Sequence, residues 1–267
     1  MRYSTLHTHT IFSDGKHMPE DNVLSAIEKN MVSIGFSDHS STDFKLDCCI
    51  KPVTIPAYIA EIRRLQKKYA DQIEIYLGME YDGYSVVKDR ELYDYIIGDA
   101  HYLKIGDEYC TVDDSRDTQL RHIEQYFNGD HNAYIKMYFE TYVDSVQRLK
   151  PEILGHFDLL TKFNVFDENS PAYRKVALEA LIASLKVSPL IEMNTGAMSR
   201  KAKDTPYPAP FLLKEILNQG GHIILNSDSH DLNHLDFYFN ESIEILRSVG
   251  YDHIIQLIGG KFTEVGI

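Results

Sequence analysis

Residues 220–230 read Gly220-Gly221-His222-Ile223-Ile224-Leu225-Asn226-Ser227-Asp228-Ser229-His230. The glycine pair follows a segment with helical periodicity and is typical of a helix C-terminus, whereas a phosphate-binding glycine loop would stand between a strand and a helix. The apolar run 222–225 is short and β-branched, which favours a buried strand. The polar residues after it mark the end of that strand. This stretch therefore predicts a helix followed by a strand that ends in potential ligands.

The same order of elements recurs along the chain. Further short apolar runs lie at 32–36, 73–77, 95–98, 153–155 and 190–193, and helical periodicity covers 55–69, 133–149, 170–185 and 210–218. Strands that alternate with helices form parallel sheets with the helices outside, and in one domain of this size a closed barrel is expected. No internal repeat or Gly/Ser linker divides the sequence. We predict an α/β barrel that occupies residues 1–267 as a single domain.

Histidines and carboxylates follow the predicted strands at the points where the strands end. His7-Thr8-His9 places two imidazoles on one face of an extended segment, because residues i and i+2 point the same way. The C-terminal ends of parallel barrel strands open onto one face, so residues from different strands meet there. The potential ligands are six histidines and three carboxylates, namely His7, His9, His39, His101, His156, His230, Asp14, Glu80 and Asp228.

A single histidine at a strand end is more often a hydrogen-bonded core or loop residue than a metal ligand. A hydrogen-bonded rim without metal is the corresponding alternative for the whole set, but nine such residues at one end of successive strands are hard to explain by chance. Imidazole and carboxylate groups together are the donors that divalent transition metals use. The set therefore predicts a metal centre.

The overall charge excludes several kinds of partner. The 267 residues contain 27 Lys and Arg against 40 Asp and Glu, which gives a net charge of −13. Binding to nucleic acid or to an anionic membrane surface needs clustered basic residues, so neither is expected. We see no apolar run long enough for a membrane span or a signal peptide, and three cysteines are too few for a disulfide framework. We expect a cytoplasmic protein with free thiols.

Taken together, the motifs at the strand ends resemble the PHP (polymerase and histidinol phosphatase) family of metal-dependent phosphoesterases. The motifs are His7-Thr8-His9 with Ser13-Asp14-Gly15, Ser37-Asp38-His39, Glu80, His101, Gly155-His156 and Asn226-Ser227-Asp228-Ser229-His230. Within that family, the chain length and the stretch 192–196 with Arg200 resemble the stand-alone histidinol-phosphate phosphatases. The resemblance implies a distorted, TIM-like (β/α)7 barrel that holds up to three divalent ions of zinc, manganese or iron.

The resemblance also implies a distribution of ligands. A first ion would be held by His7, His9, Glu80 and Asp228; Glu80 would bridge to a second ion completed by His101 and His156; and Asp14, His39 and His230 would hold a third. The sequence departs from the family pattern at Asp99, where many relatives have serine. This departure puts the hydrogen bonding around His101 in doubt.

The reaction implied by the resemblance is hydrolysis of L-histidinol phosphate to L-histidinol and phosphate, a step of histidine biosynthesis. Three divalent ions against three carboxylates would leave a site of about +3, which suits a phosphate dianion and a metal-bridging hydroxide that attacks phosphorus. Arg200 would bind the phosphate through its planar fork, with Asn194 and Lys162 as further candidates. Either Asp228 or His230 could supply or relay a proton to the leaving alkoxide.

Several alternatives stay open. Another small phosphate ester such as a nucleotide, or phosphotyrosine in a protein, would use the same chemistry. A non-catalytic metal-binding module would be expected to lack ligands, and an amidohydrolase would carry a metal-bridging lysine after a strand. Five acidic loop residues could bind the ammonium group of histidinol, namely Asp43, Asp47, Glu108, Asp113 and Asp114. The six remaining histidines are expected at the surface or in packing, namely His17, His122, His131, His222, His234 and His253. The sequence leaves the oligomeric state open.

Overall fold

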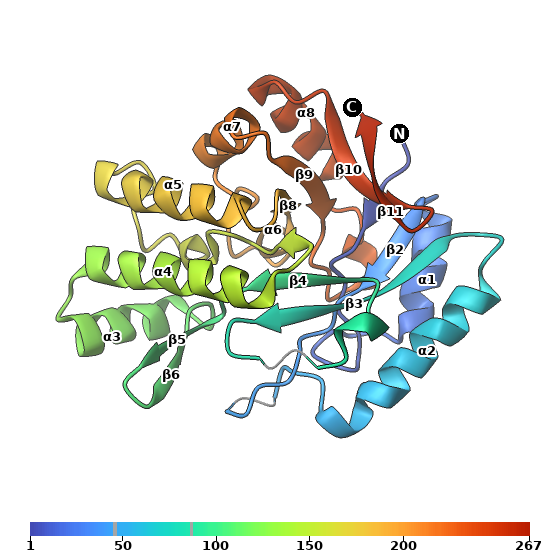
Figure 1. Ribbon diagram of the computed structural model, residues 1–267, viewed down its shortest axis with the longest axis horizontal. Helices are drawn as coiled ribbons and strands as arrows, with labels where there is room; N and C mark the ends of the chain where they lie inside the picture. Colours follow the sequence, from blue (N-terminus) through green and yellow to red (C-terminus); the bar gives the residue numbers. More distant parts are fainter. Residues whose placement is uncertain (45–46, 86–87) are drawn as a thin grey trace.

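A nine-stranded sheet forms the centre of the protein (Figure 1). The computed structural model describes residues 1–44, 47–85 and 88–267. The strands follow the order β1 (Ser4–Thr5), β2 (Ser33–Phe36), β3 (Glu74–Asp82), β4 (Tyr95–Asp99), β7 (Ile153–Leu154), β8 (Leu190–Asn194), β9 (His222–Asn226), β10 (His253–Ile258) and β11 (Lys261–Gly266). Every pairing in this order is parallel except that of β10 with β11.

The sheet curls until its first strand meets its seventh. Just beyond the C-terminal ends of β1 and β9, Thr8 and Ser229 form a parallel bridge. At the other end β10 lies between these strands, because Gln256 Nε2 donates to the Arg2 carbonyl at 3.0 Å and Ser33 Oγ donates to the Leu257 carbonyl at 3.0 Å. The predicted distorted α/β barrel is confirmed. The C-terminal hairpin β10–β11 was not among the predicted strands.

Helices cover the outside of the sheet, with α3, α4 and α5 on one flank and α1 and α2 on another (Figure 1). The helices are α1 (Pro19–Glu28), α2 (Ile55–Lys68), α3 (Arg116–Phe127), α4 (His131–Leu149), α5 (Pro171–Leu185), α6 (Gly196–Ser199), α7 (Pro210–Asn218) and α8 (Phe239–Val249). Proline begins α1, α5 and α7, where its missing N–H costs no helical hydrogen bond. Ser170 and Asp130 cap the N-termini of α5 and α4.

The interior of the barrel is filled by apolar side chains from almost every parallel strand. They are Leu6, Tyr76, Tyr95, Ile97, Ile153, Leu190, Ile224, Ile255 and Leu257. Tyr95 is fully buried and donates to the Leu6 carbonyl. A Cβ at Gly35 or Gly78 would lie 2.4 or 2.3 Å from the Tyr95 ring system, so glycine is needed at both positions. This packed interior separates the two ends of the barrel.

The aromatic face of α4 packs into the core, as its helical spacing predicts. Tyr134, Tyr138 and Tyr142 are fully buried. The hydroxyls of Tyr138 and Tyr142 donate to the carbonyls of Phe157 and Gly155 at 3.1 and 2.6 Å, and so fix the loop after β7. The polar region 107–132 forms part of the hairpin β5 (Tyr102–Ile105) and β6 (Glu108–Thr111), followed by α3. In the part of the chain that is described, no helix is long and apolar enough to cross a membrane.

Candidate metal centre

The segment that leaves β1 carries two histidines to the C-terminal end of the barrel. His9 N–H donates to the Ser229 carbonyl at 2.9 Å, and Ser229 N–H donates to the His7 carbonyl at 3.2 Å. This pairing holds the first segment extended beside the segment after β9, so the chain's first and last ligand motifs become neighbours. Both imidazoles are buried. Asp38 anchors the turn that follows, because its carboxylate accepts hydrogen bonds from the backbone and side chains of Thr10 and Ser13.

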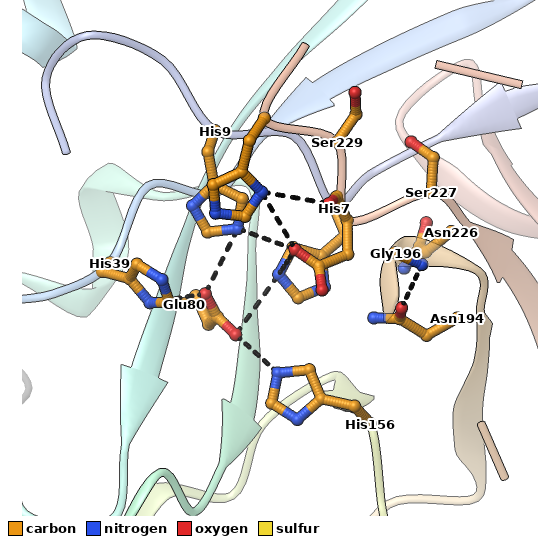
Figure 2. A network of polar contacts seen from close by, with 12 residues as sticks. His7, His9, His39, Glu80, His156, Asn194, Gly196, Asn226, Ser227 and Ser229 are labelled. Atoms are coloured by element: carbon orange, nitrogen blue, oxygen red, sulfur yellow. Dashed lines mark hydrogen bonds and ion pairs between the residues drawn. The ribbon is translucent and has the colours of Figure 1, made fainter. Parts of the chain in front are cut away.

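The Glu80 carboxylate lies at the middle of the cluster. It comes from β3, and its side chain is 1% exposed. Figure 2 shows the imidazoles of His7, His9, His39 and His156 turned towards it. The distances from Glu80 oxygens to ring nitrogens are 3.2 Å for His7, 3.5 Å for His9, 2.8 Å for His39, 2.9 Å for His156 and 3.7 Å for His101. One carboxylate therefore contacts five histidines.

All nine residues predicted from the strand ends come together at this rim. They fall into overlapping groups whose ligand atoms lie within 4.8 Å of one another: His9, Asp14, His39 and His230; Glu80, Asp99, His101 and His156; His7, His156 and Asp228; and His7, His9 and Glu80. The grouping differs in detail from the expected one. Asp228 joins His7 and His156, and His9 also approaches the group that contains Asp14.

The donor atoms themselves fit divalent metal ions. His7 Nε2, His9 Nε2 and Glu80 Oε2 are buried, and their imidazole–carboxylate contacts of 2.8 to 3.2 Å lack good hydrogen-bond geometry among the described residues. Buried polar atoms that are not well hydrogen-bonded usually have a ligand or a functional reason. Imidazole nitrogens and carboxylate oxygens converge here from several strands, which is the donor set that Zn, Mn and Fe accept. The residues present therefore fit the metal centre that the sequence predicts.

A family model supports the same interpretation. The model described as "PHP domain" matches residues 5–196, which is most of the chain. The chain belongs to the PHP domain family.

Several relatives match this PHP domain protein over most of its length. The chain is 29% identical over 234 residues to a probable histidinol-phosphatase of Schizosaccharomyces pombe. This alignment covers 79% of this chain and 74% of the relative. It is 26% identical to a probable histidinol-phosphatase of Deinococcus radiodurans, with 91% and 92% of the two chains covered. The crystal structure of histidinol phosphate phosphatase from Lactococcus lactis, complexed with zinc, L-histidinol and phosphate, matches with a TM-score of 0.74 and 22% identity over 98% of this chain and 99% of that one. That structural match shows the shared fold.

Two buried acids in this PHP domain were missed as parts of the site. Asp99 is fully buried, and its Oδ1 lies 3.0 Å from His101 Nδ1. Neither Asp99 oxygen has a hydrogen-bond partner by strict geometry among the described residues. The spacing of Asp99 and His101, two residues apart at a strand end, is the same signal that identified His7 and His9. Asp99 is therefore a further candidate ligand, and it is also the carboxylate next to His101 Nδ1.

Glu192 is the second missed acid, and it supports two histidines at once. Its Oε2 lies 2.9 Å from His7 Nδ1, and its Oε1 accepts from the His156 N–H at 2.8 Å. The hydrogen bond at Nδ1 leaves His7 Nε2 facing Glu80 and Asp228. A carboxylate behind a ligating histidine fixes the ring and its tautomer.

The three residues expected to contact substrate have different surroundings. Arg200 lies at the rim, where its guanidinium donates to Asp228 Oδ2 at 3.0 Å and approaches His230 Nδ1 at 2.9 Å. Asn194 is fully buried; its amide donates to Glu192 at 2.8 Å and its oxygen accepts from the Gly196 N–H at 2.8 Å. Figure 2 shows this contact with Gly196. Both polar ends of Asn194 thus form hydrogen bonds inside the protein, whereas this residue was expected near the substrate.

Lys162 also differs from its expected role. Its Nζ donates to the Asp113 carboxylate and to the Asp113 carbonyl, each at 2.9 Å. This ammonium group is therefore held by an acid rather than free for a phosphate. Asp113 itself faces a cavity of about 280 Å³ that begins at Asp14, His39, Glu80 and His101.

The outer wall of this cavity is acidic and polar. Its residues include Asp82, Asp113, Asp114, Tyr102, Thr111, Cys48 and Cys49. Asp113 and Asp114 are thus two of the five loop acids that the sequence suggested for the substrate. Glu108 instead accepts a hydrogen bond from Tyr126, and Asp43 lines a separate cavity. The cavity therefore joins the histidine-rich rim to a wall that carries Asp82, Asp114 and the Asp113 carboxylate paired with Lys162.

Opposite charges set the protonation of the rim. Burial alone would lower the pKa of His39, but the carboxylates of Glu80 and Asp14 raise that pKa to about 10. Burial, together with the neighbouring His230 and His39, lowers the pKa of His9 to about 3. Burial would raise the pKa of Glu80, yet the adjacent imidazoles hold it well below its usual range. Without metal the rim binds protons, and a divalent ion would have to displace them.

Replacing Glu192 by glutamine should weaken metal binding without unfolding the protein. The substitution keeps the size of a fully buried side chain but removes the negative charge behind His7. Loss of such a supporting group costs ~10–100-fold in metal affinity. Competition with a chelator, followed by elemental analysis, measures the change. Glu179→Gln, on the exposed face of α5, is the matched control; equal affinities in the two variants would contradict the role of Glu192.

Proposed function

We propose that the protein is a metal-dependent phosphomonoesterase that hydrolyses L-histidinol phosphate to L-histidinol and phosphate. The observation that carries the proposal is the convergence of six histidines and two further carboxylates around the buried Glu80. Similar relatives over most of the chain named histidinol-phosphatase or probable histidinol-phosphatase support the substrate. The structural match bound to L-histidinol and phosphate supports it further.

The nine predicted residues, together with Asp99, would hold the metal ions. Bound divalent ions would supply positive charge for the phosphate oxygens and lower the pKa of water towards neutrality. Glu80 would be shared between ions, since it belongs to two of the ligand groups. Gly196 makes room for Asp228, because a Cβ there would lie 2.6 Å from Asp228 Oδ2. Asp228 has a φ of 46°, a left-handed backbone conformation of the kind that concentrates at functional sites.

Arg200 would bind the phosphate on the side of the rim formed by Asp228 and His230. Its guanidinium is held in place by Asp228 through a side-chain and a backbone contact, at 3.0 and 2.9 Å. A guanidinium fixed in this way presents its remaining N–H groups to an anion. His230 Nε2 lies 3.2 Å from Asp14 Oδ1, and the His230 side chain is 20% exposed. His230 or Asp228 would move the proton to the leaving alkoxide.

The acidic wall would select the rest of the substrate. L-histidinol phosphate is an anion at its phosphate and a cation at its ammonium group. The metal rim and Arg200 would bind the phosphate. The carboxylates of Asp82, Asp113 and Asp114 would face the ammonium group. Lys162 would act as a positioning residue that orients Asp113. A nucleotide or a plain aryl phosphate would meet this wall without a compensating positive charge.

A substrate panel tests the proposal. Phosphate release should be measured from L-histidinol phosphate, adenosine monophosphate, phosphotyrosine and p-nitrophenyl phosphate with metal-loaded protein. We expect kcat/KM for L-histidinol phosphate to exceed the others by at least about 10²-fold, because unpaired polar groups in a pocket reject analogues strongly. Similar kcat/KM values for all four compounds would still indicate a phosphoesterase, but they would contradict L-histidinol phosphate as its specific substrate. Preference for the nucleotide or for phosphotyrosine would favour the corresponding alternative.

A further inference from the structure

The opposite end of the barrel carries a second cluster of potential ligands. His222 is the first residue of β9, His253 is the first residue of β10, and Glu264 lies in β11. Each offers one ligand atom, and these atoms lie within 4.8 Å of one another. Neither histidine belongs to the strand-end motifs of the metal centre. Two imidazoles and one carboxylate are a donor set of catalytic zinc sites and suit other transition metals.

Strand register places the three side chains on one face. Ile224 of β9 pairs with Ile255 of β10, and Ile255 pairs with Glu264 of β11. His222 and His253 each precede their partner isoleucine by two residues, and side chains alternate along a strand, so both point the same way as Glu264. Ile224 and Ile255 line the barrel interior. The cluster therefore lies at the N-terminal mouth of the barrel, below the packed interior.

The local contacts favour metal binding over a simple ion pair. The His253 Nε2 atom lies 3.8 Å from Glu264 Oε1, and the ring of His222 lies 5.9 Å from that of His253. Asp252 Oδ1 lies 2.6 Å from His253 Nδ1. A carboxylate on one ring nitrogen fixes the tautomer that leaves the other nitrogen free for a metal. An ion pair between His253 and Glu264 would give the His222 imidazole no role.

We propose that His222, His253 and Glu264 bind one divalent transition-metal ion, separate from the metal centre at the other rim. Strand β9 begins at His222 and ends at Asn226, just before Asp228, so the cluster and the metal centre lie at opposite ends of this strand, about 13 Å apart along it. An ion there would join three strands and fasten the C-terminal hairpin to the barrel. A cavity of about 410 Å³, lined in part by His222, Glu264 and Phe262, opens beside the cluster and gives an ion access from solvent. The proposal does not depend on the proposed function.

Calorimetric titration of zinc chloride into the zinc-loaded holoenzyme, after removal of loose metal, tests this site. We expect one further zinc ion per chain, bound at least about tenfold more weakly in His222→Gln and in His253→Gln, since each variant removes one ligand. His131→Gln, an exposed histidine at the start of α4, should bind zinc like the unmodified protein. No additional ion in the holoenzyme, or equal binding in all three variants, would overturn the proposal.

Hydrogen exchange separates a specific site from loose surface binding. Added zinc should slow amide exchange in residues 253–266 of the unmodified holoenzyme, and it should leave exchange in His253→Gln unchanged. Phosphate release should be the same in all of these proteins, because the cluster lies away from the reacting groups. Zinc that slows exchange equally in the variant, or that leaves the hairpin unchanged in the unmodified protein, would overturn the proposal.

Discussion

Glu80→Gln should lose turnover of L-histidinol phosphate by more than about 10²-fold, because loss of a group that only supports a ligand already costs ~10–100-fold. The Glu80 carboxylate contacts five histidines at 2.8 to 3.7 Å and is buried at the centre of the rim. Glutamine fills the same space but cannot supply the negative charge that two groups of ligands share. Metal content should fall together with activity. Phosphate release and elemental analysis on the same samples measure both effects.

Glu74→Gln is the matched control for this prediction. Glu74 lies on the same strand at its opposite end, where its carboxylate accepts a hydrogen bond from the Gly259 N–H at 2.7 Å. The same chemical change there should leave metal content and phosphate release unaltered. A folded Glu80→Gln protein, judged by circular dichroism, that retains metal and normal turnover would show that the reaction takes place elsewhere.

Arg200→Ala should lower kcat/KM by roughly 10²-fold or more while metal content stays the same, because removing one donor to a transition-state oxygen commonly costs this much. Arg200 contacts Asp228 and His230 but is not itself a metal ligand. The variant removes the cation that faces the substrate phosphate. Steady-state kinetics with L-histidinol phosphate, together with elemental analysis, measure the two quantities separately.

Two further variants define this effect. Arg200→Lys should recover only part of the activity, because lysine keeps the charge and loses the planar fork. Arg247→Ala, which removes an exposed arginine paired with Glu244 on α8, should be indistinguishable from the unmodified protein. Loss of metal in Arg200→Ala would mean that Arg200 acts by supporting Asp228. An unchanged rate would show that Arg200 does not bind the substrate phosphate.

The strand-end pattern was enough to predict the barrel and the nine histidines and carboxylates that meet at its rim. Parallel strands bring their C-terminal ends to one face, so residues as far apart as His7 and His230 can be assigned to one place without knowing any contact. The structure adds the centre of that arrangement. The resemblance to the family implied that Glu80 bridges two ions, and its contacts with five histidines now show how the rim is organised.

The contacts behind the rim could not be predicted in the same way. Glu192 supports His7, which is 185 positions away, because β8 and β1 approach one another only in the folded barrel. Asn194 was expected near substrate but is buried against Glu192, and Lys162 is paired with Asp113. Such partners depend on side-chain direction inside a polar network, which hydrophobic periodicity does not report. The hairpin β10–β11 was missed although 253–258 is apolar enough to form a strand.

The most direct measurement follows phosphate release from L-histidinol phosphate while metal is removed and restored. Metal should be stripped with a chelator, counted by elemental analysis, and returned as zinc, manganese or iron in separate samples. We predict that turnover falls to the background rate in the stripped protein and returns in step with the metal content. Full turnover by folded protein that contains no metal would contradict the assignment of the histidine-rich rim as the catalytic centre.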